Sequence, residues 1–153
     1  MDAHLINPFI KATLNVLETM AFIKATPQNP FLKKDNVAKG DVSSVIGLSG
    51  ESKGTISITF TETCILSIVS NMFGETMPQI NDEVMDAVGE IANMISGQAR
   101  QVLEGKGKVL YAAVPTMIKG KDHTISHKTT APIMAVPFKT EHGDFTIEVC
   151  FED

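Results

Sequence analysis

The stretch from Asn81 to Gly105 is the longest periodic segment of the chain, and it constrains the fold more than any other feature. Its apolar residues recur at spacings of three and four, as on one face of an α-helix: Val84, Val88, Ile91, Ile95 and Val102. Roughly six helical turns fit into this length, and a glycine is a typical residue at a helix end. The sequence therefore predicts a long amphipathic helix whose apolar stripe faces a core supplied by the rest of the chain.

Helical and strand-like segments follow one another in blocks along the remaining sequence. Residues 2–21 and 62–73 have helical spacing, and Gly74 follows the second where a C-terminal cap is expected. Six segments rich in Val, Ile and Thr, bounded by turn residues, predict strands: 41–48, 54–60, 108–114, 117–126, 133–139 and 145–151. The first two should pair as a hairpin, and residues 28–40 suit an irregular strand or a loop.

These blocks predict an α+β architecture. The strands come in runs with short joins and do not alternate with helices, which favours antiparallel pairing. A length of 153 residues with 43% hydrophobic residues suits one packed domain. We therefore expect a single domain over residues 1–153, in which about six mainly antiparallel strands pack with three helices.

Composition and charge exclude several classes of protein. The net charge is −5, and no cluster of basic residues is longer than the pair Lys33-Lys34, so nucleic acid is not an expected partner. Polar and charged residues interrupt the first helix, unlike a signal peptide, and no segment is long enough to span a membrane. Cys64 and Cys150 lie far apart, so we expect two reduced, buried thiols and a cytoplasmic protein without a membrane partner.

Two histidines deserve consideration as metal ligands. His123 and His127 are four residues apart, a spacing that brings imidazoles together on a helix. The sequence between them has the composition of a strand, on which they would lie roughly 13 Å apart. We therefore expect no metal site at these residues.

The outer face of the long helix carries an unusual set of side chains. With about 100° per residue, Asp86, Glu90, Asn93 and Gly97 lie within roughly 60° of one another, opposite the apolar stripe. A solvated face explains the acidic residues adequately. Relative to Ala, however, Asn costs roughly 0.5 kcal/mol and Gly about 1 kcal/mol in a helix interior. A face selected for stability alone would avoid both, so this pattern favours docking onto a partner.

The same residues form a recognisable motif. Asp86-x-x-x-Glu90-x-x-Asn93, with Pro115 further along the chain, resembles the signature of the CheC, FliY and CheX family of phosphatases, which act on the chemotaxis response regulator CheY. The single motif resembles the CheX branch. Further segments extend the resemblance over nearly the whole chain and imply a CheC-like fold: Asn7-Pro8-Phe9, Gly40-Asp41-Val42-Ser43, Ile46-Gly47-Leu48-Ser49-Gly50, Gly74-Glu75 and Asp86-Ala87-Val88-Gly89-Glu90-Ile91.

The resemblance implies an enzyme that removes the aspartyl phosphate of a CheY-like receiver. Such a receiver already provides the acyl phosphate, Mg²⁺ and a lysine, so an attacking water in line with the leaving oxygen is what remains to be supplied. The carboxamide of Asn93 suits this role, because it both accepts and donates hydrogen bonds. By resemblance, Glu90 would pair with the receiver's lysine, while Asp86 and Gly97 would belong to the partner-binding surface. No cofactor bound by this chain is expected.

Two further expectations concern partners. Since CheX members resemble homodimers and exposed strand edges favour pairing, we expect a dimer joined through the sheet. The alternative function is a receiver-binding or chemotaxis adaptor module that does not hydrolyse phosphate. A structural subunit akin to the flagellar switch relatives is a third interpretation. An Asn93→Ala change discriminates the first two, because only an enzyme has turnover to lose.

Overall fold

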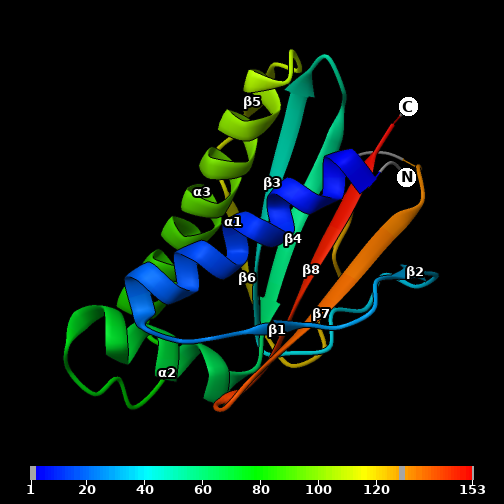
Figure 1. Ribbon diagram of the computed structural model, residues 1–153. Helices are drawn as coiled ribbons and strands as arrows, with labels where there is room; N and C mark the ends of the chain where they lie inside the picture. Colours follow the sequence, from blue (N-terminus) through cyan, green and yellow to red (C-terminus); the bar gives the residue numbers. More distant parts are fainter. Residues whose placement is uncertain (1–2, 128–129, 153) are drawn as a thin grey trace.

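The computed structural model describes residues 3–127 and 130–152, which form a layer of helices packed on one face of an antiparallel sheet (Figure 1). The three helices in these residues are α1 (Ala3–Ala21), α2 (Glu62–Phe73) and α3 (Asp82–Gly105). The eight strands are β1 (Thr26–Pro27), β2 (Phe31–Lys33), β3 (Val42–Gly50), β4 (Gly54–Phe60), β5 (Leu110–Ala112), β6 (Thr116–Lys119), β7 (Ile133–Thr140) and β8 (Gly143–Phe151). The predicted α+β class and the three helices are confirmed.

The sheet has the strand order β1-β7-β8-β4-β3-β5, and all of its pairs are antiparallel. The predicted hairpin is present, with Val42 of β3 opposite Phe60 of β4. Each edge consists of two short strands in succession, since β1 and β2 both pair with β7, and β5 and β6 both pair with β3. The two strands beyond the expected six are β1 and β2. Strand β2 lies in the segment 28–40, for which the sequence favoured an irregular strand or a loop, whereas β1 precedes that segment and was not predicted.

The hydrophobic core lies between the helices and the sheet. Alternate residues of β8, Phe145, Ile147 and Val149, point into it, so the residues between them occupy the opposite face. Phe145 stacks on Phe138 with ring centroids 4.7 Å apart. No helix of the described residues is long and apolar enough to cross a membrane.

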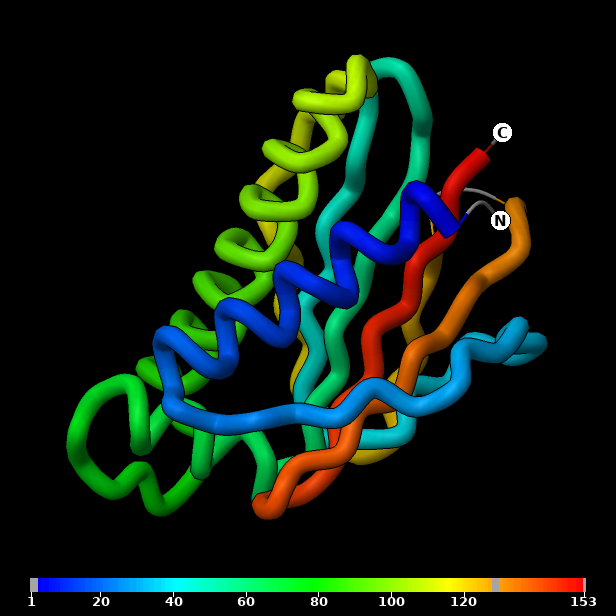
Figure 2. Tube along the Cα trace, viewed as in Figure 1, coloured from blue at the N-terminus to red at the C-terminus, as the bar shows by residue number. Residues whose placement is uncertain are grey.

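The long helix packs on this core, with one correction to its apolar stripe. Val84, Val88, Ile91 and Ile95 are buried as expected, but Val102 is 48% exposed. Ala99 and Leu103 continue the buried face in its place. Helix α1 runs across α3 and diverges from it toward the C-terminal end of α3 (Figure 2). Val102 lines a groove between the two helices, whereas Ala99 and Leu103 are buried.

A second correction concerns the predicted strand at residues 117–126. Strand β6 ends at Lys119, because Gly120 (φ 145°) and Asp122 (φ 48°) turn the chain out of an extended path. Beyond this turn, Thr124 forms only an isolated bridge with Val37. The segment at residues 108–114 is likewise shorter, since β5 covers only Leu110–Ala112. His123 and His127 consequently do not share a continuous strand.

Candidate active site

Helix α3 is fixed at its start by local hydrogen bonds. The side chain of Asn81 caps the helix by accepting from the backbone N–H of Val84 at 2.9 Å. Lys119 Nζ of β6 donates to the carbonyl oxygen of Ile80 at 2.8 Å, which ties the preceding loop to the sheet. Asp82 and Glu83 in the first turn complement the helix dipole. These contacts and the buried stripe fix the rotation of the helix about its axis.

This rotation places the predicted site residues on one outward face. Asp86, Glu90 and Asn93 are exposed, and Gly97 is half-buried. Their helical positions put all four side by side, so the structure brings the set together. The carboxylates of Asp86 and Glu90 lie on the N-terminal side of Asn93.

Gly89 explains how closely this turn approaches the sheet. A Cβ atom added at Gly89 would lie 3.0 Å from Sδ of Met117 on β6, which is tighter than ordinary contact. The missing side chain therefore allows the turn that carries Glu90 to sit directly on β6. Sequence reasoning did not assign this role, although a buried glycine next to a site residue is a signal for close packing.

On the outward face, no side chain covers the helix backbone at Gly97. A Cβ atom added there would meet only Arg100 Nη2, at 4.0 Å, so the helix backbone is accessible from outside. Arg100 Nε donates a hydrogen bond of 3.2 Å to Ser96 Oγ. Sequence reasoning missed Arg100, which is the only arginine of the chain. Its position seven residues after Asn93 was the available signal, since seven residues are close to two full helical turns.

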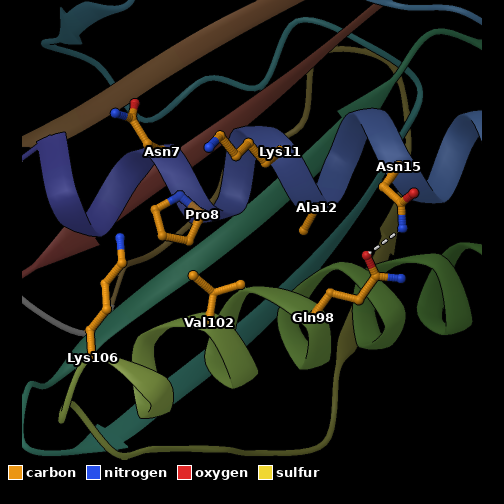
Figure 3. Close-up of a pocket in the computed structure, with 8 residues that line it drawn as sticks. All are labelled: Asn7, Pro8, Lys11, Ala12, Asn15, Gln98, Val102 and Lys106. Carbon is orange, nitrogen blue, oxygen red and sulfur yellow. Dashed lines mark hydrogen bonds between the residues drawn. The ribbon is translucent and has the colours of Figure 1, made fainter.

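A groove opens beside this face, between α1 and α3. Asn15 Nδ2 donates to Gln98 Oε1 at 2.8 Å and links the two helices at one end of the groove (Figure 3). The groove has a volume of about 220 Å³ and is lined by Asn7, Pro8, Lys11, Ala12, Asn15, Gln98, Val102 and Lys106. Lys11 and Lys106 are the only ionisable groups in this lining, and no carboxylate, thiol or imidazole accompanies them, so the groove lacks a paired constellation for acid–base or nucleophilic chemistry.

A second polar cluster lies on the opposite face of the sheet. Glu148 of β8 is 3% exposed and accepts from Lys33 Nζ at 2.6 Å. It also contacts His127 Nε2 at 2.9 Å. Burial opposes ionisation of Glu148, but the hydrogen bonds from His127 and Lys33, together with their charges, hold the pKa of its carboxyl group below the ordinary value. This closed cluster secures the segments that cover the sheet.

The two histidines that were considered as metal ligands, His123 and His127, are both engaged in such structural contacts. The ring nitrogens of His123 contact the carbonyl oxygen of Gly120 at 2.7 Å and Ser43 Oγ at 2.5 Å. His127 faces Glu148. Within residues 3–127 and 130–152, no group of three or more His, Cys, Asp or Glu side chains has the geometry to hold a metal ion.

The chemistry available on α3 follows from its side chains. The outward face provides a carboxamide and carboxylates but no hydroxyl, thiol or imidazole among Asp86, Glu90, Asn93 and Gly97. A carboxamide can orient a water molecule through simultaneous donation and acceptance, and it does not need to be deprotonated. Such a site suits a substrate that already carries a good leaving group and its own metal ion.

Comparison with known proteins places this site in a family context. Residues 42–139 match the family model for the chemotaxis phosphatase CheX, and this range contains all four site residues. The CheY-P phosphatase CheX of Thermotoga maritima is 27% identical over 153 residues, which covers 97% of each chain. A crystal structure of the chemotaxis protein CheX from Vibrio vulnificus superimposes with a TM-score of 0.93 at 45% identity, covering 98% of this chain and 100% of that one. The CheX–CheY–BeF3–Mg²⁺ complex from Borrelia burgdorferi matches with a TM-score of 0.82 at 27% identity, covering 97% of both chains.

Proposed function

The chain belongs to the CheX family of chemotaxis phosphatases, and from this premise we propose that it hydrolyses the aspartyl phosphate of a CheY-like response regulator. The observation that carries the proposal is the exposure of Glu90 and Asn93 together on the outward face of α3. The Thermotoga relative is a CheY-P phosphatase. The Borrelia relative is bound to CheY in a complex that also contains BeF3 and Mg²⁺. These similarities support a phosphorylated receiver as the substrate.

Asn93 is proposed to position the attacking water. Its side-chain oxygen would accept a hydrogen bond from the water, while its NH2 group could donate to a phosphoryl oxygen. The water oxygen then bonds to phosphorus as the bond to the aspartyl oxygen breaks, and the receiver's carboxylate leaves with the electron pair. The water proton passes to the released phosphate or to solvent. Because an acyl phosphate has a good leaving group, no general base is required from this chain.

Glu90 is proposed to dock the receiver. It lies one turn before Asn93, so a salt bridge from its carboxylate to the receiver's active-site lysine would set the register of the complex. Asp86, one turn further toward the N-terminus, would add a secondary contact. Gly97 would let the receiver approach the helix backbone, because no neighbouring atom fills the space where a side chain would stand.

No cofactor bound by this chain is needed in this proposal. The Mg²⁺ ion would belong to the phosphorylated receiver, where it neutralises the charge of the phosphoryl group. The side chains on the outward face of α3 would supply orientation and docking, and the receiver would supply the electrostatic stabilisation.

A homodimer joined through the sheet is proposed as the assembly. The edge strands expose apolar side chains that pairing would bury: Phe31 and Leu32 on β2, and Tyr111 on β5. We also assign the protein to the cytoplasm, because neither Cys64 nor Cys150 forms a disulfide and the expected substrate is a cytoplasmic receiver. Light scattering at micromolar concentration tests the assembly, and a monomer mass would rule out the dimer.

Phosphate release tests the proposed function. A CheY-like receiver is kept phosphorylated by a small phosphodonor and Mg²⁺, and this protein is added in catalytic amount. Wild type should accelerate release, and Asn93→Ala should reduce the acceleration by roughly a hundredfold or more while binding is largely retained. Glu90→Ala should weaken both binding and rate. Glu104→Ala is the matched control, since it removes an exposed carboxylate from the same helix at a distance of roughly 20 Å.

The binding-module alternative makes a different set of predictions. A protein that grips the receiver without hydrolysis would bind the phosphorylated form but leave the rate of phosphate release unchanged, and Asn93→Ala would then have no effect on turnover. Unchanged binding and rate in Glu90→Ala would contradict the docking role.

A further inference from the structure

Arg100 is held beside the bare turn of α3 that follows Asn93. Its Nε donates to Ser96 Oγ, which is fully buried and therefore a fixed anchor. Its Nη2 lies 4.0 Å from the position of a Cβ atom at Gly97. Long helical side chains point toward the N-terminus of their helix, and this one does so too. The guanidinium group is consequently about 6 Å of helical rise from Asn93.

The guanidinium group of Arg100 forms no salt bridge within the described part of the chain. Among residues 3–127 and 130–152, no carboxylate lies within salt-bridge distance of it, although Glu104 is one turn away on the same helix. The hydrogen bond to Ser96 uses Nε, which leaves both terminal NH2 groups for another acceptor. A guanidinium group presents these donors as a planar fork that matches a carboxylate.

The charges on the outward face of α3 therefore follow a fixed order along the helix axis. Glu90 lies one turn before Asn93, and the guanidinium group of Arg100 lies one turn after it. A partner that brings its phosphoryl group to Asn93 would thus have to present a cation on one side and an anion on the other. The two charged contacts would be separated by roughly 10 Å along the helix axis.

We propose that Arg100 is a substrate-docking residue that binds a carboxylate at the rim of the receiver's phosphorylation site. This inference rests on the proposed phosphatase function and adds a second charged contact to the one assigned to Glu90. The missing side chain at Gly97 leaves room for the receiver's carboxylate to reach the guanidinium fork. Since the fork is a full turn away from the amide that positions the water, Arg100 contributes to affinity and leaves the chemical step unchanged.

Affinity in a catalytically inactive background tests this role separately from turnover. A CheY-like receiver phosphorylated with a small phosphodonor and Mg²⁺ is titrated with Asn93→Ala and with Asn93→Ala/Arg100→Gln. The second variant should bind roughly tenfold or more weakly, as expected for a lost hydrogen-bonded charge pair. Arg100→Lys in the same background should be intermediate, because it keeps the charge but loses the fork. Added salt should weaken binding of Asn93→Ala more than binding of the Arg100→Gln variant.

Steady-state phosphate release provides a second test of the role of Arg100. Arg100→Gln should raise KM by about the same factor and leave kcat within twofold. Lys106→Gln is the matched control, because it removes a cation that follows the last residue of α3 and lines the groove toward α1, and its KM should be unchanged. Equal affinities of the Asn93→Ala and Asn93→Ala/Arg100→Gln variants would overturn the inference even where wild type releases phosphate. A loss confined to kcat would overturn it too, because Arg100 would then act on the reacting phosphoryl group. Absence of turnover in wild type would instead contradict the proposed function, and the affinity comparison would still decide the role of Arg100.

Discussion

Replacing Gly97 by Ala should make the protein more stable and less active. The residue lies in the interior of α3, and an added Cβ atom would meet only the flexible end of Arg100, at 4.0 Å. The folded chain therefore has room for the methyl group without strain. The same methyl group would stand between the helix backbone and any partner that approaches it closely.

The size of the stability change follows from helix propensity. Gly is about 1 kcal/mol less favourable than Ala in a helix interior, mainly because its unfolded backbone has more freedom to lose. No packing is lost at this half-buried position, so nearly the full amount should appear in the free energy of unfolding. For a domain of this size, it corresponds to a rise in melting temperature of roughly 2–4 °C.

Thermal unfolding and phosphate release, measured on the same preparations, separate the two effects. Gly97→Ala should melt at a higher temperature, bind the phosphorylated receiver more weakly and have a raised KM. Gly105→Ala adds the same methyl group in open space at the end of the helix, roughly 12 Å further along, and should leave KM unchanged. A Gly97→Ala variant with wild-type KM would refute the reasoning that the bare turn exists for the partner. An unchanged melting temperature would refute the propensity argument.

Further expectations concern three residues of the core and the sheet: Glu148, Cys64 and Gly54. The pKa of Glu148 is lower in the folded chain than its ordinary value, so the unfolded chain binds more protons at acidic pH. The free energy of unfolding should therefore fall as pH drops from above the ordinary glutamate pKa through the folded value. Glu148→Gln should reduce this pH dependence when the free energy of unfolding is measured by urea titration. At neutral pH, the same variant leaves the ammonium group of Lys33 with only the exposed carboxylate of Asp35, 3.9 Å away, and should lower the free energy of unfolding by about 3 kcal/mol. Burial raises the pKa of Cys64 to about 12, so an alkylating reagent should modify this thiol only after unfolding. Gly54→Ala would place a Cβ atom 2.4 Å from a carbonyl oxygen of β8. Chemical denaturation should show that the free energy of unfolding falls by roughly 3 kcal/mol or more.

The helices and the central hairpin could be predicted because their signals are local. The apolar spacing of α3, the cap at Gly74 and the turn between β3 and β4 each act within a few residues. The outward face of α3 followed from the same periodicity, so the exposure of Glu90 and Asn93 was available from the sequence. The functional assignment of these residues still needed the family resemblance.

The features that the sequence did not reveal depend on contacts between distant segments. Val102 has the right spacing for the buried stripe, but it is exposed because α1 diverges from α3 at that end. The edge strands β1 and β2 are short, and their pairing with β7 is set by the tertiary fold. Arg100 gained its significance only when its anchor on Ser96 and the space over Gly97 were known.

The two faces of α3 separate the requirements of stability from those of function. Val84, Val88 and Ile91 are fully buried and hold the helix on the sheet, whereas Asn93 and Gly97 add nothing to the core. Relative to Ala, these two residues together cost roughly 1.5 kcal/mol of helix propensity, which is a substantial fraction of a typical net stability of about 5–15 kcal/mol. Their retention against this cost is explained if the outward face binds a partner. A chain could therefore lose both residues, keep this fold and become more stable, so the presence of the fold alone does not establish phosphatase activity.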